Sequence, residues 1–138
     1  FAALGGEAPG GELTGEIALP VPGAVRFGDW RIEARAGDAQ AGGPRVAESV
    51  GMPAALAHDL TVRTRRPGDR MRPLGLGGAK SLQDLFVDHK IPRRLRDAYP
   101  LVCAAGGEQI LWIPGVAISE ICGPRPRDGA AWITATRV

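Results

Sequence analysis

The stretch LTVRTRRPGDRMRPLG, residues 60–75, contains the pattern that decides the fold. Its first seven residues alternate, so that Leu60 and Val62 fall on one face while Arg63 and Arg65 fall on the other. A period of two is typical of a β-strand with one buried face. The alternation therefore predicts a strand over residues 60–66 whose outer, solvent-exposed row is basic.

This strand is expected to end in a tight turn over residues 66–69. Pro67 stands at the second position and Gly68 at the third, which is the signature of a type II turn because glycine accepts a positive φ. We expect Asp69 to fix the turn or to orient a neighbouring arginine. Pro67, Gly68 and Asp69 are therefore assigned a structural role.

A short helix is predicted after a glycine-rich loop. Ser81, followed by Asp84 three residues later, has the spacing of an N-terminal capping box. Leu82, Leu85 and Phe86 then recur at helical spacing and form one apolar stripe. The sequence thus predicts a helix that begins after Ser81 and buries this stripe.

A second short helix is predicted around Pro92, which can serve as the first helical residue. Leu95 is expected on its inner face, and Arg93, Arg94 and Arg96 are expected largely on its outer face. The helix is expected to end before the next proline.

The remainder of the chain contains short apolar runs separated by turn residues, in keeping with 20 glycines and 12 prolines among 138 residues. The expected strands are residues 13–19, 25–34, 101–104, 109–114, 115–120 and 131–138. Residues 1–12 are expected to be a flexible lead-in, residues 37–44 a polar loop, and residues 46–58 an irregular or short helical stretch. The fold class predicted from this order is α+β, a mostly antiparallel β-sandwich-like domain with two short inserted helices.

Charge is distributed unevenly along the chain. Residues 63–96 contain ten basic and three acidic residues and have a net charge of +7, whereas the rest has a net charge of −5. Fifteen of the 17 basic residues are arginines, which suit bidentate contacts with phosphate. Binding to a phosphate backbone and a plain solvated basic face both remain open from charge alone. The candidate RNA-binding residues are Arg63, Arg65, Arg66, Arg70, Arg72, Lys80, Arg93, Arg94 and Arg96.

The sequence offers no constellation for catalysis or metal binding. The loop over residues 75–81 lacks two of the positions that a Walker phosphate loop requires. Cys103 lies in an apolar run where a free cysteine usually packs in a core, and neither cysteine has metal-ligand spacing. We therefore assign no catalytic residue, no metal ligand and no cofactor to this chain. Without a signal peptide, a membrane span or an initiator Met, we expect part of a longer cytoplasmic protein.

Four blocks in register, residues 63–75, 80–86, 90–101 and 110–115, resemble the C-terminal domain of the tRNA(Ile)-lysidine synthetase family. The strong part of the resemblance spans residues 60–120, and residues 13–35 are similar more weakly. The resemblance implies that residues 13–138 form a single tRNA-binding C-terminal domain. It also implies a fold shared with a domain of the phenylalanyl-tRNA synthetase β chain.

The resemblance further implies what the parent protein does. The family uses ATP to join lysine to the wobble cytidine of the tRNA(Ile) that carries a CAU anticodon, so that the tRNA reads AUA instead of AUG. This chemistry, with ATP and Mg, belongs to an N-terminal ATP-pyrophosphatase domain whose SGGxDS motif is absent from this chain.

The C-terminal domain is expected to grip the acceptor stem of that tRNA. Because the major groove of A-form RNA is too deep for side chains, the contacts should fall on phosphates, 2′-hydroxyls and the shallow minor groove. The expected partners are this tRNA and the protein's own catalytic domain. The alternative is a non-catalytic scaffolding domain that stabilises a catalytic partner domain.

Overall fold

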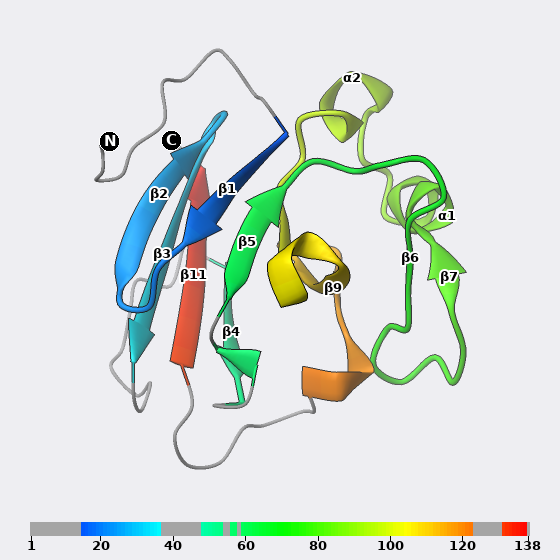
Figure 1. Cartoon of the computed structure of the whole chain (residues 1–138). Helices are drawn as coiled ribbons and strands as arrows, with labels where there is room; N and C mark the ends of the chain where they lie inside the picture. The colour runs from blue at the N-terminus through cyan, green and yellow to red at the C-terminus, as the bar shows by residue number, and fades with distance from the viewer. Residues whose placement is uncertain (1–14, 37–47, 54–55, 58, 123–130, 138) are drawn as a thin grey trace.

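Two antiparallel sheets pack face to face in the computed structural model, which describes residues 15–36, 48–53, 56–57, 59–122 and 131–137 (Figure 1). The first sheet has the order β1-β5-β8-β9-β10 and the second the order β2-β3-β11-β4. The strands of the first sheet are β1 (Glu16–Leu19), β5 (Leu60–Arg63), β8 (Leu101–Ala104), β9 (Gln109–Ile113) and β10 (Ala117–Ile118). Those of the second are β2 (Gly23–Phe27), β3 (Trp30–Ala36), β4 (Glu48–Met52) and β11 (Ala131–Arg137). The α+β class predicted from the sequence is confirmed.

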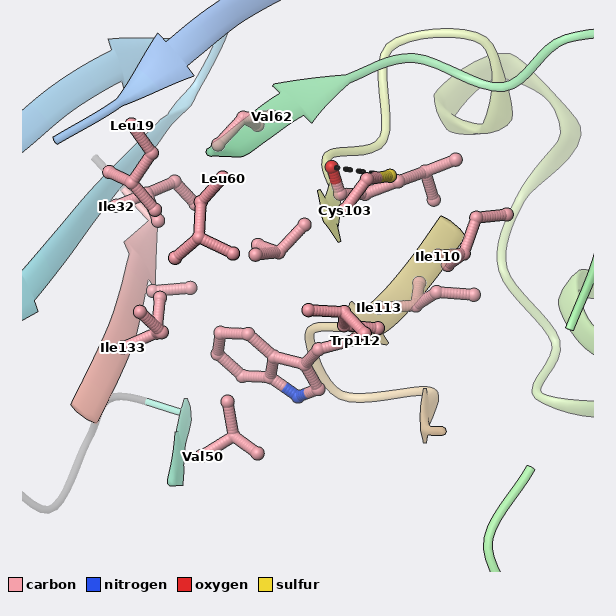
Figure 2. Close-up of a cluster of buried hydrophobic side chains, with 14 of the residues drawn as sticks. Leu19, Ile32, Val50, Leu60, Val62, Cys103, Ile110, Trp112, Ile113 and Ile133 are labelled. Atoms are coloured by element: carbon pink, nitrogen blue, oxygen red, sulfur yellow. Dashed lines mark hydrogen bonds between the residues drawn. The ribbon is translucent and has the colours of Figure 1, made fainter. Parts of the chain in front are cut away.

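The core lies between the two sheets and is built from alternate residues of their strands. Leu19 and Leu60 come from the first sheet, and Ile32 and Ile133 from the second, and all four are at most 3% exposed. Figure 2 shows these side chains gathered between the sheets together with Trp112 of β9. Burying one such aliphatic side chain contributes about 1.5–3 kcal/mol, so this layer holds the sandwich together.

The expectation of an irregular or helical stretch over residues 46–58 is wrong for β4. This strand pairs with β11 at the end of the second sheet, with Val50 opposite Ile133. Its sequence, ESVGM, has no clear alternation, and the strand forms because β11 offers an unpaired row of backbone groups. The expected lead-in, the polar loop over residues 37–44 and the first two residues of the expected first strand lie outside the described residues.

The candidate site belongs to an insertion between two strands that pair directly with each other, β5 and β8. The insertion covers residues 64–100 and contains a small sheet of β6 (Arg70–Met71) and β7 (Lys80–Ser81). It also contains α1 (Leu82–Asp88) and α2 (Arg93–Arg96), which lie together on one side of the sandwich in Figure 1. Short 3-10 turns, η3 (Ala105–Gly107) and η4 (Glu120–Cys122), follow later in the chain.

Helix α1 begins as the sequence predicts. The Ser81 side chain accepts a hydrogen bond from the backbone N–H of Asp84 at 3.1 Å, which satisfies one of the free donors of the first turn. Leu82, Leu85 and Phe86 are all buried. The predicted cap and the predicted apolar stripe are both confirmed.

Helix α2 differs from its prediction in two respects. Pro92 is the N-cap, one residue before the helix, rather than its first residue. Leu95 is half-buried rather than fully inward, and Arg96 is also half-buried because its Nε donates to the Ile91 carbonyl at 2.8 Å. A helix of one turn has little surface to pack, so Arg93 and Arg94 stay exposed and none of its side chains is fully buried.

A row of aromatic rings joins the insertion to the sandwich. The Tyr99 ring lies 5.5 Å from Trp30 of β3 and 5.4 Å from Phe86 of α1, both in tilted geometry. The Tyr99 hydroxyl also donates to the Pro114 carbonyl at 2.6 Å. Such contacts stabilise beyond the area that they bury, so α1 is fixed against the second sheet.

Among the described residues, no helix is long and apolar enough to cross a membrane.

Leu85→Ala is expected to lower the free energy of unfolding by about 2–5 kcal/mol, because it leaves a cavity under α1. Leu76→Ala makes the same chemical change at a loop side chain that is 52% exposed, and it should stay within about 0.5 kcal/mol. Urea unfolding of both variants measures the difference. Equal losses at the two positions would contradict the placement of the apolar stripe.

Candidate nucleic-acid interface

Arg63 is not on the surface, and its expected place in a basic outer row is wrong. Its side chain is 2% exposed because η3 covers this face of the first sheet. The Arg63 Nε donates to the Gly107 carbonyl at 2.8 Å, and Nη1 donates to the Thr64 carbonyl at 3.0 Å. Both carboxylate oxygens of Asp69 accept from the same guanidinium, at 2.9 and 3.0 Å. Arg63 therefore holds the fold together and is not available to RNA in this structure.

Asp69 fixes the turn and orients an arginine, as its position suggested. Its Oδ2 accepts from the backbone N–H of Arg66 at 2.7 Å, in addition to the bonds from Arg63. The backbone N–H of Asp69 donates to the Arg66 carbonyl at 3.1 Å, and Gly68 has a φ of +84°. These features confirm the structural role predicted for the turn over residues 66–69.

The pKa values of this pair reflect the balance between burial and hydrogen bonding. Burial alone would raise the pKa of Asp69, but the hydrogen bonds from Arg63 and from the backbone of Arg66 bring it below its ordinary value. Burial alone would lower the pKa of Arg63, and its bonds to Asp69 raise it instead. Both groups are therefore charged at neutral pH, and each compensates the other.

Four of the remaining candidate cations form ion pairs, three of them with acids at least 32 residues away in the sequence. The pairs are Arg65–Asp97 at 2.9 Å, Arg66–Glu16 at 2.7 Å, Arg72–Glu120 at 2.6 Å, and Lys80–Asp88. All four are partly exposed, so each is worth about 0–1 kcal/mol and leaves its cation within reach of a ligand. The net charge of +7 counted along the segment therefore overstates the free positive charge.

Arg70, Arg93 and Arg94 form no ion pair among the described residues, and all three are exposed. Arg96 bonds only to the Ile91 carbonyl. Lys90, which the sequence analysis did not include, is also exposed and unpaired within the described ranges. These side chains have the most charge to offer a phosphate.

Three of the candidates, Arg65, Arg66 and Arg70, meet in a cleft of about 560 Å³. The cleft lies between the turn over residues 66–69, the start of α1 and the end of α2. The residues that line it are Arg65, Arg66, Pro67, Gly68, Asp69, Arg70, Ser81, Leu82, Gln83 and Asp97. The remaining candidates are not part of its lining, so the structure gathers a third of the predicted set.

Sequence reasoning did not identify the acids that accompany these arginines. Asp97 lines the cleft and pairs with Arg65, which is 32 residues earlier in the chain. Ser81 and Gln83 also line it, although Ser81 was recognised only as a cap. No local pattern links Asp97 with Arg65, because their contact depends on how α2 returns to the first sheet.

Metal binding and thiol chemistry have no support among the described residues. They contain no group of three or more His, Cys, Asp or Glu side chains that could hold a metal ion. Burial raises the pKa of the Cys103 thiol to about 12 and that of Cys122 to about 11. Neither thiol is a nucleophile near neutral pH, since only the thiolate reacts.

Comparisons with known proteins agree with one another. Residues 60–132 match the family model described as the TilS substrate C-terminal domain. The tRNA(Ile)-lysidine synthase of Symbiobacterium thermophilum is 56% identical over 83 residues, which are 60% of this chain and 16% of that protein. The synthase of Geobacillus kaustophilus is 52% identical over 64 residues, 46% of this chain and 14% of that protein.

A crystal structure of a TILS C-terminal domain has a TM-score of 0.75 and 32% identity to this chain. The likeness covers 89% of this chain and 96% of that one. The matched region spans about a sixth or less of the length of the curated relatives.

Asp69→Asn is expected to lower the free energy of unfolding at neutral pH by about 3 kcal/mol, because it leaves the buried Arg63 without its counter-charge. A lowered folded pKa means that the contribution of Asp69 is present above the unfolded value of about 3.9 and is lost as pH falls through the folded value. The unchanged chain should therefore lose stability below about pH 5 more steeply than Asp69→Asn.

Asp97→Asn is the control, because it breaks an exposed pair and should change stability by at most about 1 kcal/mol. Urea unfolding across pH 3–8 measures all three proteins. Parallel pH profiles for the unchanged chain and Asp69→Asn would show that the buried pair does not govern acid sensitivity.

Proposed function

Because the chain belongs to the family of TilS substrate C-terminal domains, we propose that it is the tRNA-binding part of a tRNA(Ile)-lysidine synthase. The observation that carries the proposal is a family match over residues 60–132, the same part of the chain that presents the unpaired arginines. In this proposal the parent enzyme acts in the cytoplasm. It joins lysine to the wobble cytidine of tRNA(Ile) with a CAU anticodon, and its N-terminal domain uses ATP with Mg.

The domain contributes affinity and orientation rather than chemistry. Arg70 in the cleft and Arg93 and Arg94 on α2 bind backbone phosphates of the acceptor stem, which A-form geometry leaves accessible. The partly exposed Arg65, Arg66, Arg72 and Lys80, each in an ion pair, add weaker contacts where the RNA reaches them. Arg63 is excluded from this surface by its burial.

The alternative, a scaffolding domain, has one observation in its favour. An apolar groove of about 460 Å³ lies beside the loop after β6. Leu74 and Leu76 line this groove and are 41% and 52% exposed. In this second proposal the groove, whose lining also includes Lys80, receives part of the catalytic domain of the same synthase. If scaffolding is the only role, the chain should bind tRNA no more tightly than it binds an acidic polypeptide.

Arg93→Gln with Arg94→Gln is expected to weaken tRNA binding and to reduce the log–log salt slope by about 1.4–1.8, the value for two phosphate contacts. Both side chains are exposed, so the melting temperature should hardly change. Arg31→Gln with Arg35→Gln changes the net charge equally on β3, where both arginines are exposed and pair with Glu33. Filter binding over a salt series compares the two variants. An equal loss in the β3 variant would show that overall charge, not this face, controls binding.

Arg70→Gln is expected to weaken tRNA binding several-fold more than Arg72→Gln does. The two arginines are two residues apart and exposed, but Arg70 lines the cleft without an ion-pair partner in the described ranges, while Arg72 pairs with Glu120. The comparison therefore isolates the effect of a free guanidinium in the cleft. Titration of tRNA against both variants at one salt concentration measures it, and the opposite ranking would move the contact surface away from the cleft.

A further inference from the structure

The guanidinium of Arg65 is held in place before any ligand arrives. Its side chain is 26% exposed, its Cζ lies 5.8 Å from the centre of the Phe86 ring, and it lines the cleft beside Arg70. Phe86 is fully buried and belongs to the aromatic row that fixes α1. A fixed cation binds an anion with a smaller entropy loss than a mobile one.

The acid that faces Arg65 is held much less firmly. Nε and Nη2 of Arg65 both lie against a single oxygen of Asp97, Oδ1, at 3.0 and 2.9 Å. The Asp97 side chain is 85% exposed, and the structure gives its other oxygen no partner among the described residues. An exposed pair of this kind is weak, and a bidentate contact with a phosphate is stronger.

We propose that Asp97 occupies the position of an RNA phosphate on Arg65 and is displaced when RNA enters the cleft. The inference rests on the proposed tRNA-binding function and adds a device that regulates it. Asp97 keeps the guanidinium ordered and neutralised when no RNA is bound. The exchange of Asp97 for a phosphate on Arg65 becomes favourable only when the ligand also brings a phosphate to Arg70. A small anion with one phosphate cannot do both, so its binding is disfavoured.

The other acidic partners fit this role less well. Asp69 is 12% exposed and is committed to the buried Arg63, so it cannot leave without the cost of a buried unpaired charge. Glu16 pairs with Arg66, but Glu16 does not line the cleft, and the Arg66 side chain is 46% exposed. Among the acids that the structure describes, only Asp97 combines a fixed cation, an exposed carboxylate and a position in the cleft.

Asp97→Asn is the test, with tRNA(Ile) of CAU anticodon as the probe in filter binding over a salt series. The variant is expected to lower the Kd at low salt about two- to fivefold, the range that an exposed ion pair corresponds to. The salt slope should stay unchanged, since Arg65 contacts one phosphate in both proteins and the number of phosphate contacts sets the slope. Asp84→Asn is the matched control, because Asp84 is an exposed acid near the cleft without an ion pair among the described residues.

A double-mutant cycle assigns the effect to Arg65. In an Arg65→Gln background, Asp97→Asn is expected to give no gain beyond that of Asp84→Asn. Thermal melts check that each variant folds, and Asp97→Ser serves as a second variant if Asp97→Asn melts early. A gain that persists without Arg65, or equal gains for Asp97→Asn and Asp84→Asn, would overturn the inference.

The source of the phosphate is tested by competition. Inorganic phosphate at constant ionic strength, in tenfold excess over the tRNA phosphates, is expected to leave tRNA binding by the unchanged chain unaltered. Competition at that level would assign the position to free phosphate instead. If the unchanged chain binds tRNA and Asp97→Asn does not tighten it, only this inference fails. If neither protein binds tRNA more tightly than an acidic polypeptide, the proposed function fails with it.

Discussion

The buried guanidinium of Arg63 is the constraint on which the insertion depends. A charge with 2% exposure is tolerable only when its donors are satisfied and its charge is compensated. Those requirements bring together Gly107 of η3, the backbone of Thr64 and both oxygens of Asp69. The backbone carbonyl of Asp69 then accepts from Leu82 N–H at 3.1 Å, so the same residue leads from the buried pair to the first turn of α1.

The ion pairs around the insertion decide how much of its positive charge is free. Five of the ten cations in residues 63–96 face an acid, and one of those five is also buried. The free charge is therefore concentrated on Arg70 and around α2, with weakly held pairs beside it. A surface of this kind is more selective than a uniformly basic one, because a ligand must compete with internal acids for part of its contacts.

The cleft side of the insertion is more rigidly held than α2. Tyr99 links Trp30 to Phe86, and Phe86 supports Arg65, so the cleft side is tied to the second sheet. Helix α2 has one turn, no buried residue and two exposed arginines. In the proposed complex with tRNA, the cleft therefore offers a fixed position for one phosphate, while α2 offers side chains that can adjust to the next.

The sequence by itself determined the elements whose signals are local. The turn over residues 66–69, the Ser81 cap and the apolar stripe of α1 follow from backbone preferences and periodicity, and the structure confirms each. Alternation correctly placed Arg63 on the other face of the strand from Leu60 and Val62, but it cannot say what covers the face that carries Arg63. Only the tertiary structure decided that η3 covers it, that β4 pairs with β11, and that Asp97 faces Arg65. These three outcomes depend on contacts between residues far apart in the chain, whose energies no local pattern records.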